Sequence, residues 1–301
     1  MWTTAVLLTS ALALAPGQAP PAGALTLSNP RATHGELGSA RQESKLLPGD
    51  IFFLSFDIEG IKVTDTGRVK YGMVMEVIDS AGKAIFKQQP VERDDFLPLG
   101  GNKLPARAYV SIGVDQPAGI YTCKVTVSDL SNKEKPVSKT LEQKFEVLPK
   151  GFGIVQLYTA ADLKGDVPAS LVGVAGQFVF VHFALIGFER EAAKAPAVPP
   201  KIDPKADPKA PAAAPTRQPN LKIEMTVYDK DSKPTLATPT VKEIPDESDG
   251  MVDEKAVGVP MRFLVPMNRE GGYLIEIKAT DNVTKKTAKV YLPLRVFPAG
   301  Q

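Results

Sequence analysis

The sequence has few of the residues on which most enzyme and metal chemistry depends. Its 301 residues include one cysteine and two histidines. A single cysteine excludes an internal disulfide framework and a multi-cysteine zinc site. Two histidines leave little scope for histidine-dependent acid–base catalysis, and the sequence contains no Gly-x-Ser-x-Gly segment that would mark a serine nucleophile. The residue content therefore predicts a protein that is not an enzyme and carries no cofactor.

An excess of charge of one sign is also missing. The chain carries 36 Lys and Arg against 34 Asp and Glu, a formal net charge of +2. A nucleic-acid-binding protein would show a clustered basic face, so this balance predicts no nucleic-acid partner. No glycine-rich phosphate loop follows an expected strand, which also argues against nucleotide chemistry.

Long hydrophobic runs are limited to two. The first, from Ala5 to Ala15, has the length of the apolar region of a signal peptide and is too short to span a bilayer. We expect residues 1–24 to be a signal peptide cleaved after Ala24, although no Lys or Arg precedes Arg31. The alternative is a retained apolar tail. The prediction is a secreted, periplasmic or cell-surface protein of a bacterium.

The second run extends from Leu171 to Phe188 and reaches the length of a membrane-span candidate. Three glycines and many β-branched and aromatic residues favour strands instead. The run also aligns with an earlier segment that contains Asp50, Asp57 and Glu59, charges that a membrane helix would not tolerate. We therefore expect no transmembrane anchor after signal cleavage.

The sequence contains an internal duplication. Four segments of the first half reappear in the same order in the second half. The pairs are 49–60 with 176–187, 71–79 with 221–229, 119–129 with 271–281, and 145–149 with 294–298. Four matches in one order predict two copies of one unit, with a boundary near residue 150.

The repeated segments have the pattern of half-buried strands. Phe52, Leu54, Phe56 and Ile58 alternate with other residues, and the second copy alternates in the same way from Val179. Short alternating segments separated by turn signals, without a convincing helical run, predict an all-β sandwich in each copy.

One motif adds a resemblance to a known fold family. Gly119-x-Tyr121-x-Cys123 is similar to the F strand of immunoglobulin-like domains, where a tyrosine two residues before the cysteine bonds to upstream backbone. Gly271 and Tyr273 repeat the element, with Ile275 in place of the cysteine. The chain lacks the partner cysteine and the core tryptophan, so it resembles the disulfide-free bacterial Ig-like or fibronectin-III-like sandwiches. The resemblance implies structural roles for these two Gly-Tyr pairs.

The expected organisation follows from these observations. Residues 1–24 are the predicted signal peptide, 25–149 the first Ig-like sandwich and 150–301 the second. The second copy carries an insertion at 191–219, rich in proline, alanine and lysine, which we expect to be extended and disordered. This insertion is either a flexible arm for a partner or a tolerated loop expansion.

Acidic clusters are the only candidates for a metal site. Two segments expected to be loops contain them, and their oxygen ligands suit Ca²⁺. The calcium candidates are Asp94, Asp95, Asp246, Glu247 and Asp249. Ordinary solvated charge is the competing interpretation, and the prediction for the metal site is therefore none.

The function predicted from the sequence is a non-catalytic, exported structural or protein-binding module with an unknown protein or cell-envelope partner. The alternative is a carbohydrate-binding or calcium-dependent accessory module of the cell envelope. Exposed aromatic side chains gathered on the folded protein would favour the carbohydrate alternative.

Overall fold

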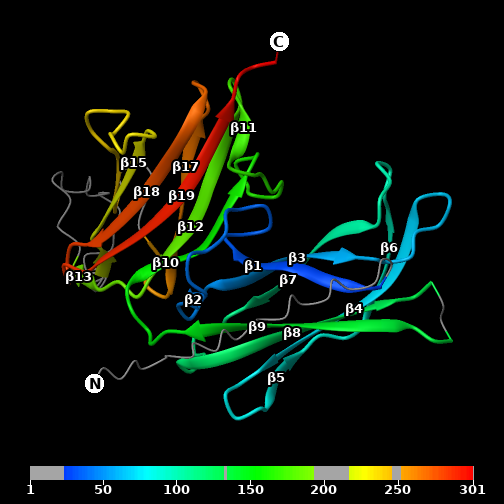
Figure 1. The fold of residues 1–301 in the computed structure, drawn as a ribbon. Coiled ribbons are helices and arrows are strands. Elements are labelled where there is room, and N and C mark those ends of the chain that lie inside the picture. The colour runs from blue at the N-terminus through cyan, green and yellow to red at the C-terminus, as the bar shows by residue number, and fades with distance from the viewer. Residues whose placement is uncertain (1–23, 132–133, 193–216, 246–251, 301) are drawn as a thin grey trace, which may run out of the picture.

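The computed structural model describes residues 24–131, 134–192, 217–245 and 252–300. These residues form nineteen β-strands and no helix. Figure 1 draws the strands as arrows in the order of the chain. The prediction of an all-β protein is therefore confirmed. No helix in this part of the chain is long and apolar enough to cross a membrane.

The N-terminal half contains two sheets (Figure 1). The first has the order β1-β3-β7, and the second has the order β2-β9-β8-β4-β5, with β6 also paired to β4. The bounds are β1 (Thr26–Thr33), β2 (Lys45–Leu46), β3 (Ile51–Glu59), β4 (Arg68–Ile78), β5 (Ala84–Lys87), β6 (Val91–Phe96), β7 (Lys103–Ser111), β8 (Gly119–Asp129) and β9 (Val137–Val147).

The C-terminal half repeats this arrangement. Its sheets have the orders β10-β12-β17 and β11-β19-β18-β15-β16, and β13 and β14 form a separate two-stranded ladder. The bounds are β10 (Gly153–Ala160), β11 (Val172–Val174), β12 (Phe178–Ile186), β13 (Arg190–Ala192), β14 (Arg217–Pro219), β15 (Leu221–Tyr228), β16 (Thr240–Ile244), β17 (Gly258–Pro266), β18 (Gly271–Asp281) and β19 (Thr287–Phe297).

The two halves match even in their irregularities. Strand β1 pairs with β3 through a register shift at Asn29, and β10 pairs with β12 through a shift at Gln156. Both residues have a φ of 52°, and they lie 127 positions apart, the same interval as in the 49–60 and 176–187 segments. A bulge of this kind increases the twist of a strand and turns a side chain to a new direction.

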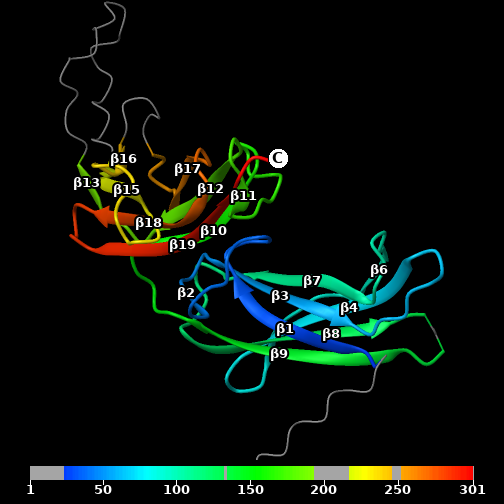
Figure 2. The ribbon, with the colours of Figure 1, turned by 45° about the horizontal axis from the view of Figure 1, so that its top comes forward.

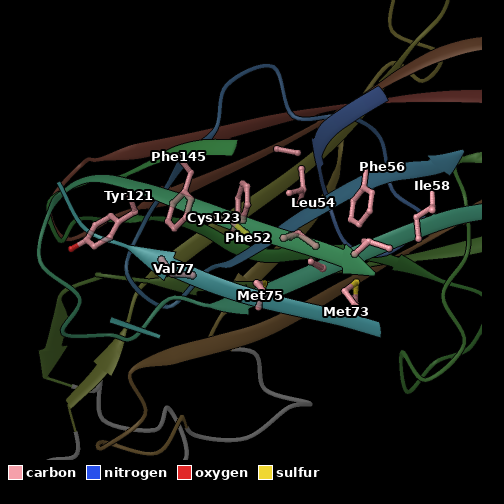
Figure 3. Close-up of a cluster of buried hydrophobic side chains, with 14 of the residues drawn as sticks. Phe52, Leu54, Phe56, Ile58, Met73, Met75, Val77, Tyr121, Cys123 and Phe145 are labelled. Atoms are coloured by element: carbon pink, nitrogen blue, oxygen red, sulfur yellow. The ribbon is translucent and has the colours of Figure 1, made fainter. Parts of the chain in front are cut away.

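Each half encloses its own hydrophobic core. In the N-terminal half the alternating residues of β3 meet those of β4 across the interior, as Figure 3 shows. Phe52, Leu54 and Ile58 have no exposed surface, and Phe52 stacks on Phe145 with ring centroids 4.5 Å apart. The second core is built from equivalent strands, with Val181 and Leu185 fully buried on β12. Period-2 alternation thus accounts for one buried face on each of these strands.

Polar contacts around the buried Asp50 carboxylate join the two halves. The Asp50 carboxylate forms an ion pair with Arg41 at 3.0 Å, and the two side chains are 4% and 9% exposed. The same carboxylate accepts a hydrogen bond of 2.8 Å from the backbone N–H of Gln156, the bulge residue of the other half. The Gln156 side-chain amide in turn donates to the Gly49 carbonyl. The loop that follows β1 reaches toward the C-terminal half in Figure 2, and Gly35 there lies against Tyr158.

The second apolar run forms strands, since Leu171–Phe188 contains β11 and β12. The structure describes the two ends of the predicted insertion at 191–219. These ends are not irregular, because β13 and β14 pair with each other, and Arg190 donates hydrogen bonds of 2.9 Å to the carbonyls of Asp253 and Ala256. The central part, residues 193–216, lies outside the described residues, as do residues 1–23 of the predicted signal peptide.

Candidate functional site

Each half has a hollow at the same place in the fold. It lies beside the tyrosine that begins β8 or β18, between the end of the edge strand β7 or β17 and the strand β4 or β15. We call these the N-terminal hollow and the C-terminal hollow. Their linings correspond position by position, for example Val77 with Val227 and Tyr121 with Tyr273.

The N-terminal hollow is small, with a volume of about 170 Å³. Ile85 and Phe86 of β5 contribute to its wall. Phe86 is the cross-strand partner of the buried Val77, so its side chain lies on the core-facing side of the sheet. Phe145 of β9 also lines the hollow.

The C-terminal hollow is larger, with a volume of about 450 Å³. Leu236, the residue at the position of Phe86, is 65% exposed. Thr235 and Leu294 replace Ile85 and Phe145, so the lining has lost apolar bulk. The floor consists of side chains that are at most 8% exposed: Met225, Val265, Met267, Leu294 and Val296.

The rim of the C-terminal hollow is polar. Hydroxyl and amide groups come from Thr226, Thr235, Thr238, Thr240 and Asn268. Arg269 donates a hydrogen bond of 3.0 Å from Nε to the Tyr273 hydroxyl oxygen. This hydrogen bond raises the pKa of Arg269. The guanidinium is charged at neutral pH, as arginine side chains are in general. An apolar floor with a few polar groups at the mouth is the usual composition of a ligand site, and the volume lies within the range of roughly 300–1,000 Å³ for such sites.

A third hollow lies in the N-terminal half between β6 and β7, and we call it the polar hollow. Its volume is about 490 Å³. The Tyr71 hydroxyl donates a hydrogen bond of 2.8 Å to Asp95 in its wall. Burial and this carboxylate raise the pKa of Tyr71 well above its usual value, so the hydroxyl keeps its proton. Tyr109 and Phe96 also line the hollow and are 62% and 59% exposed.

The calcium candidates of the N-terminal half do not lie on a loop. Asp94 and Asp95 are neighbours on strand β6, where successive side chains point to opposite faces. The expectation of a loop at this place is wrong, because residues 91–96 pair with β4 along their whole length. Asp94 forms ion pairs with Arg68 and Lys70, whereas Asp95 bonds to Tyr71 on the other face. The two carboxylates therefore do not converge.

The remaining calcium candidates, Asp246, Glu247 and Asp249, lie outside the described residues. In the part of the chain that the structure does describe, no group of three or more His, Cys, Asp or Glu side chains could hold a metal ion.

The predicted Gly-Tyr pairs begin β8 and β18. The Tyr121 hydroxyl donates a hydrogen bond of 2.8 Å to the Pro117 carbonyl, and that of Tyr273 bonds to the carbonyls of Arg269 and Glu270. A side chain at Gly271 would press on the Tyr273 ring, because its Cβ would lie 3.2 Å from the hydroxyl oxygen. Gly119 holds the corresponding place before Tyr121.

Of the reactive side chains that the sequence offers, Cys123 and His182 are buried and His34 is half-buried. Cys123 has no exposed surface, and burial raises the pKa of its thiol to about 12, so no thiolate forms at neutral pH. His182 stacks on Tyr158 with ring centroids 4.9 Å apart. His34 lies in the loop after β1, and burial together with Arg41 lowers its pKa to about 3.

Known proteins give little guidance. No protein-family model matches the sequence, and no curated protein matches it either. Solved structures that match include the C-terminal domain of the antigen I/II polypeptide BspA of Streptococcus agalactiae. It has 10% identity and a TM-score of 0.27, over 90% of this chain and 100% of that chain. The C-terminal domain of the antigen I/II-family protein AspA of Streptococcus pyogenes has 8% identity and a TM-score of 0.28, over 90% of this chain and 99% of that one. At these TM-scores the likeness assigns neither a family nor a function.

Proposed function

We propose that the protein is an exported, non-catalytic binding module that accepts an aromatic side chain of a partner polypeptide in its C-terminal hollow. The observation that carries the proposal is the pair of equivalent hollows, one narrowed by Ile85, Phe86 and Phe145 and the other open. We further propose that the module consists of two Ig-like domains, residues 25–149 and 150–301, behind a signal peptide at 1–24.

Two observations support the Ig-like assignment. In each half a three-stranded sheet faces a larger sheet. The first two strands of the half each form an edge of one of these sheets: β1 and β2 in the N-terminal half, β10 and β11 in the C-terminal half. The short strands β2 and β11 run parallel to the last strand of their half, whereas the longer ladders are antiparallel. The hydroxyl-to-carbonyl bonds of Tyr121 and Tyr273 are those of a tyrosine corner.

The occupant of the C-terminal hollow follows from the comparison with the other half. A phenyl ring, that of Phe86, forms part of the wall at the equivalent place, so this region of the fold accommodates an aromatic group. Met225 and Met267 line the open hollow, and methionine adapts to irregular shapes and packs well against aromatic rings.

The rim favours a polypeptide over a simple hydrocarbon. Its threonine hydroxyls both donate and accept hydrogen bonds, as peptide N–H and C=O groups require. Asn268 adds an amide with the same double capacity, and Arg269 adds a donor. A peptide that places an aromatic residue in the hollow therefore finds polar partners for its backbone at the mouth.

The experiment uses the methionine methyl groups as reporters. The full chain, labelled with ¹³C at the methionine methyls, is titrated with N-acetyl-L-phenylalaninamide and, separately, with N-acetyl-L-leucinamide. We expect the phenylalanine probe to shift the signals of Met225 and Met267 by its ring current. Met75, the equivalent of Met225 in the other half, lies in the N-terminal core and should not move.

The variant Leu236→Phe should close the hollow and abolish these shifts, with an unchanged or higher Tm. Phe86→Leu, the reverse change at the equivalent position, is the matched control and should leave the shifts at Met225 and Met267 intact. No shift with either probe, or an undiminished shift in Leu236→Phe, would overturn the proposal. Equal shifts with both probes would mean that the hollow binds apolar groups and does not prefer aromatic ones, which would contradict the proposed occupant.

A further inference from the structure

We propose that the polar hollow of the N-terminal half is a second binding site, and that it takes a neutral sugar residue. The site lies in the other half of the chain from the C-terminal hollow, so the two proposals stand or fall separately. Three features support it: the charges in its wall balance, aromatic rings beside it are exposed, and the C-terminal half has apolar residues at the equivalent positions.

The hollow lies between β6 and β7, which belong to different sheets of the N-terminal half. Arg93 of β6 is the cross-strand partner of the buried Tyr71, so both side chains lie on the core-facing side of their sheet. Asp95, two residues further along β6, lies on the same side and accepts the hydrogen bond from Tyr71. Strand β7 supplies the opposite wall with Arg107 and Tyr109.

The charges in the wall cancel. Two carboxylates, those of Glu36 and Asp95, face two guanidinium groups, those of Arg93 and Arg107. Glu36 and Arg107 form an ion pair with each other. A site with no net charge gives no advantage to an ionic ligand, but its donors and acceptors together suit a group that does both. Sugar hydroxyls are such groups, since each donates one hydrogen bond and accepts others.

Aromatic rings supply the apolar part of the recognition. The ring of Tyr109 packs against that of Phe53 at 5.5 Å between centroids, and most of its surface remains open to solvent. Phe96 lines the same hollow from the end of β6. The C–H face of a pyranose ring is apolar and packs flat on such a ring, while the hydroxyls at its edge reach the charged groups.

The C-terminal half shows that the fold does not require these polar groups. The positions of Tyr71 and Arg93 are held there by Leu221 and Ile244, which are cross-strand partners in the same way and are 0% and 9% exposed. The position of Tyr109 is held by Leu264. Inward-facing charges can also protect the edge of a sheet from pairing with another chain. That role accounts for Arg93 but gives no reason for the exposed rings beside it.

The test is a titration of the full ¹⁵N-labelled chain with neutral methyl glycosides: methyl β-D-glucopyranoside, methyl α-D-mannopyranoside, methyl β-D-galactopyranoside and methyl N-acetyl-β-D-glucosaminide. At least one should shift the backbone amide signals of residues 93–95 and 107–109. Asp95→Asn and Tyr109→Ala should each weaken that glycoside about tenfold or more, the effect of losing about 1.4 kcal/mol of binding free energy. Asp95→Asn keeps an acceptor for Tyr71, so the fold is preserved.

The matched control is Leu264→Ala, which removes the side chain at the position of Tyr109 in the other half and should leave glycoside binding unchanged. If none of the four glycosides shifts these signals, or if both N-terminal variants bind as the native chain does, the proposal is wrong. Tighter binding of D-glucuronate than of the neutral glycosides would also overturn it, because a neutral site has no preference for an anion.

Discussion

The two halves of this chain share their strand order, their bulges and their hydrophobic cores, and they differ at the margins of those cores. At one margin, Ile85, Phe86 and Phe145 narrow a hollow that Thr235, Leu236 and Leu294 leave open. At the other, Tyr71 and Arg93 create a polar hollow where Leu221 and Ile244 form an apolar core. Strand centres, where both copies kept large apolar residues, determine the fold. Positions at the margins of the cores are free to change because fewer groups there must be buried.

The largest difference expected between equivalent positions is at the joint between the halves. Asp50→Ala should destabilise the protein by about 3–5 kcal/mol, because it leaves the nearly buried Arg41 without its carboxylate. It also removes the acceptor of the Gln156 N–H. Gln177 holds the position of Asp50 in the C-terminal half, but it is exposed. Gln177→Ala should therefore change stability by less than about 0.5 kcal/mol.

Urea denaturation followed by circular dichroism measures both variants. If both variants lost a similar amount of stability, the buried ion pair would stabilise the protein no more than an exposed side chain does.

The next effect is a dependence on pH that comes from His34, whose position in the other half is held by Ala161. The folded protein keeps the pKa of His34 near 3, whereas the unfolded chain has the ordinary value of 6.5. The unfolded state therefore binds the proton first, and stability falls as the pH falls below 6.5. Between pH 6.5 and pH 5 this loss reaches about 1.6 kcal/mol.

The interval from pH 6.5 to pH 5 isolates this histidine from the carboxylates. The carboxyl groups with lowered pKa lose their stabilising contribution at lower pH, as they become protonated: Asp57, Asp162, Glu224, Asp229 and Asp281. The unfolding free energy of His34→Gln should fall less steeply in this interval than that of the native chain, by the contribution of His34. If His34→Gln kept the native slope of unfolding free energy against pH, that slope would come from other titratable groups.

The elements that could be predicted from the sequence are those with one fully buried face. Strands β3 and β12 bury every second residue, from Phe52 and from Val179, and β8 and β18 alternate from Tyr121 to Asp129 and from Tyr273 to Asp281. In these segments burial alone determines which residue types are accepted, and both copies accepted the same types. The all-β class and the duplication follow from them.

The edge strands could not be found in this way. Strands β7 and β17 are equivalent, yet both contain proline, at Pro105 and Pro260, and both expose an arginine, at Arg107 and Arg262. Proline is accepted on an edge strand because one side of the strand makes no ladder bonds. The same freedom weakens the alternation that sequence patterns detect.

The hollows were missed for a related reason. Each depends on how an edge segment lies beside its neighbour: Phe86 is opposite Val77 on β4, whereas Leu236 lines its hollow from the connection between β15 and β16. Asp94 and Asp95 were expected on a loop because four consecutive polar or charged residues suggest solvent. Their strand is held by pairing with β4 and not by burial of its own side chains.

The smallest contrast expected is between the two tyrosines at the start of β8 and β18. Tyr121 is 6% exposed, and its hydroxyl donates to Pro117 and accepts a hydrogen bond of 2.8 Å from the Gln116 side chain. Tyr121→Phe leaves both groups without this partner at a part-buried place, which should cost about 1–2 kcal/mol. The hydroxyl of Tyr273 lies at an exposed place, where water can replace it. Tyr273→Phe should therefore cost about 0.5 kcal/mol, and thermal unfolding of the two variants tests the order. A larger loss in Tyr273→Phe would mean that the rim of the C-terminal hollow is held by this hydroxyl, and the hollow would then be a rigid part of its half.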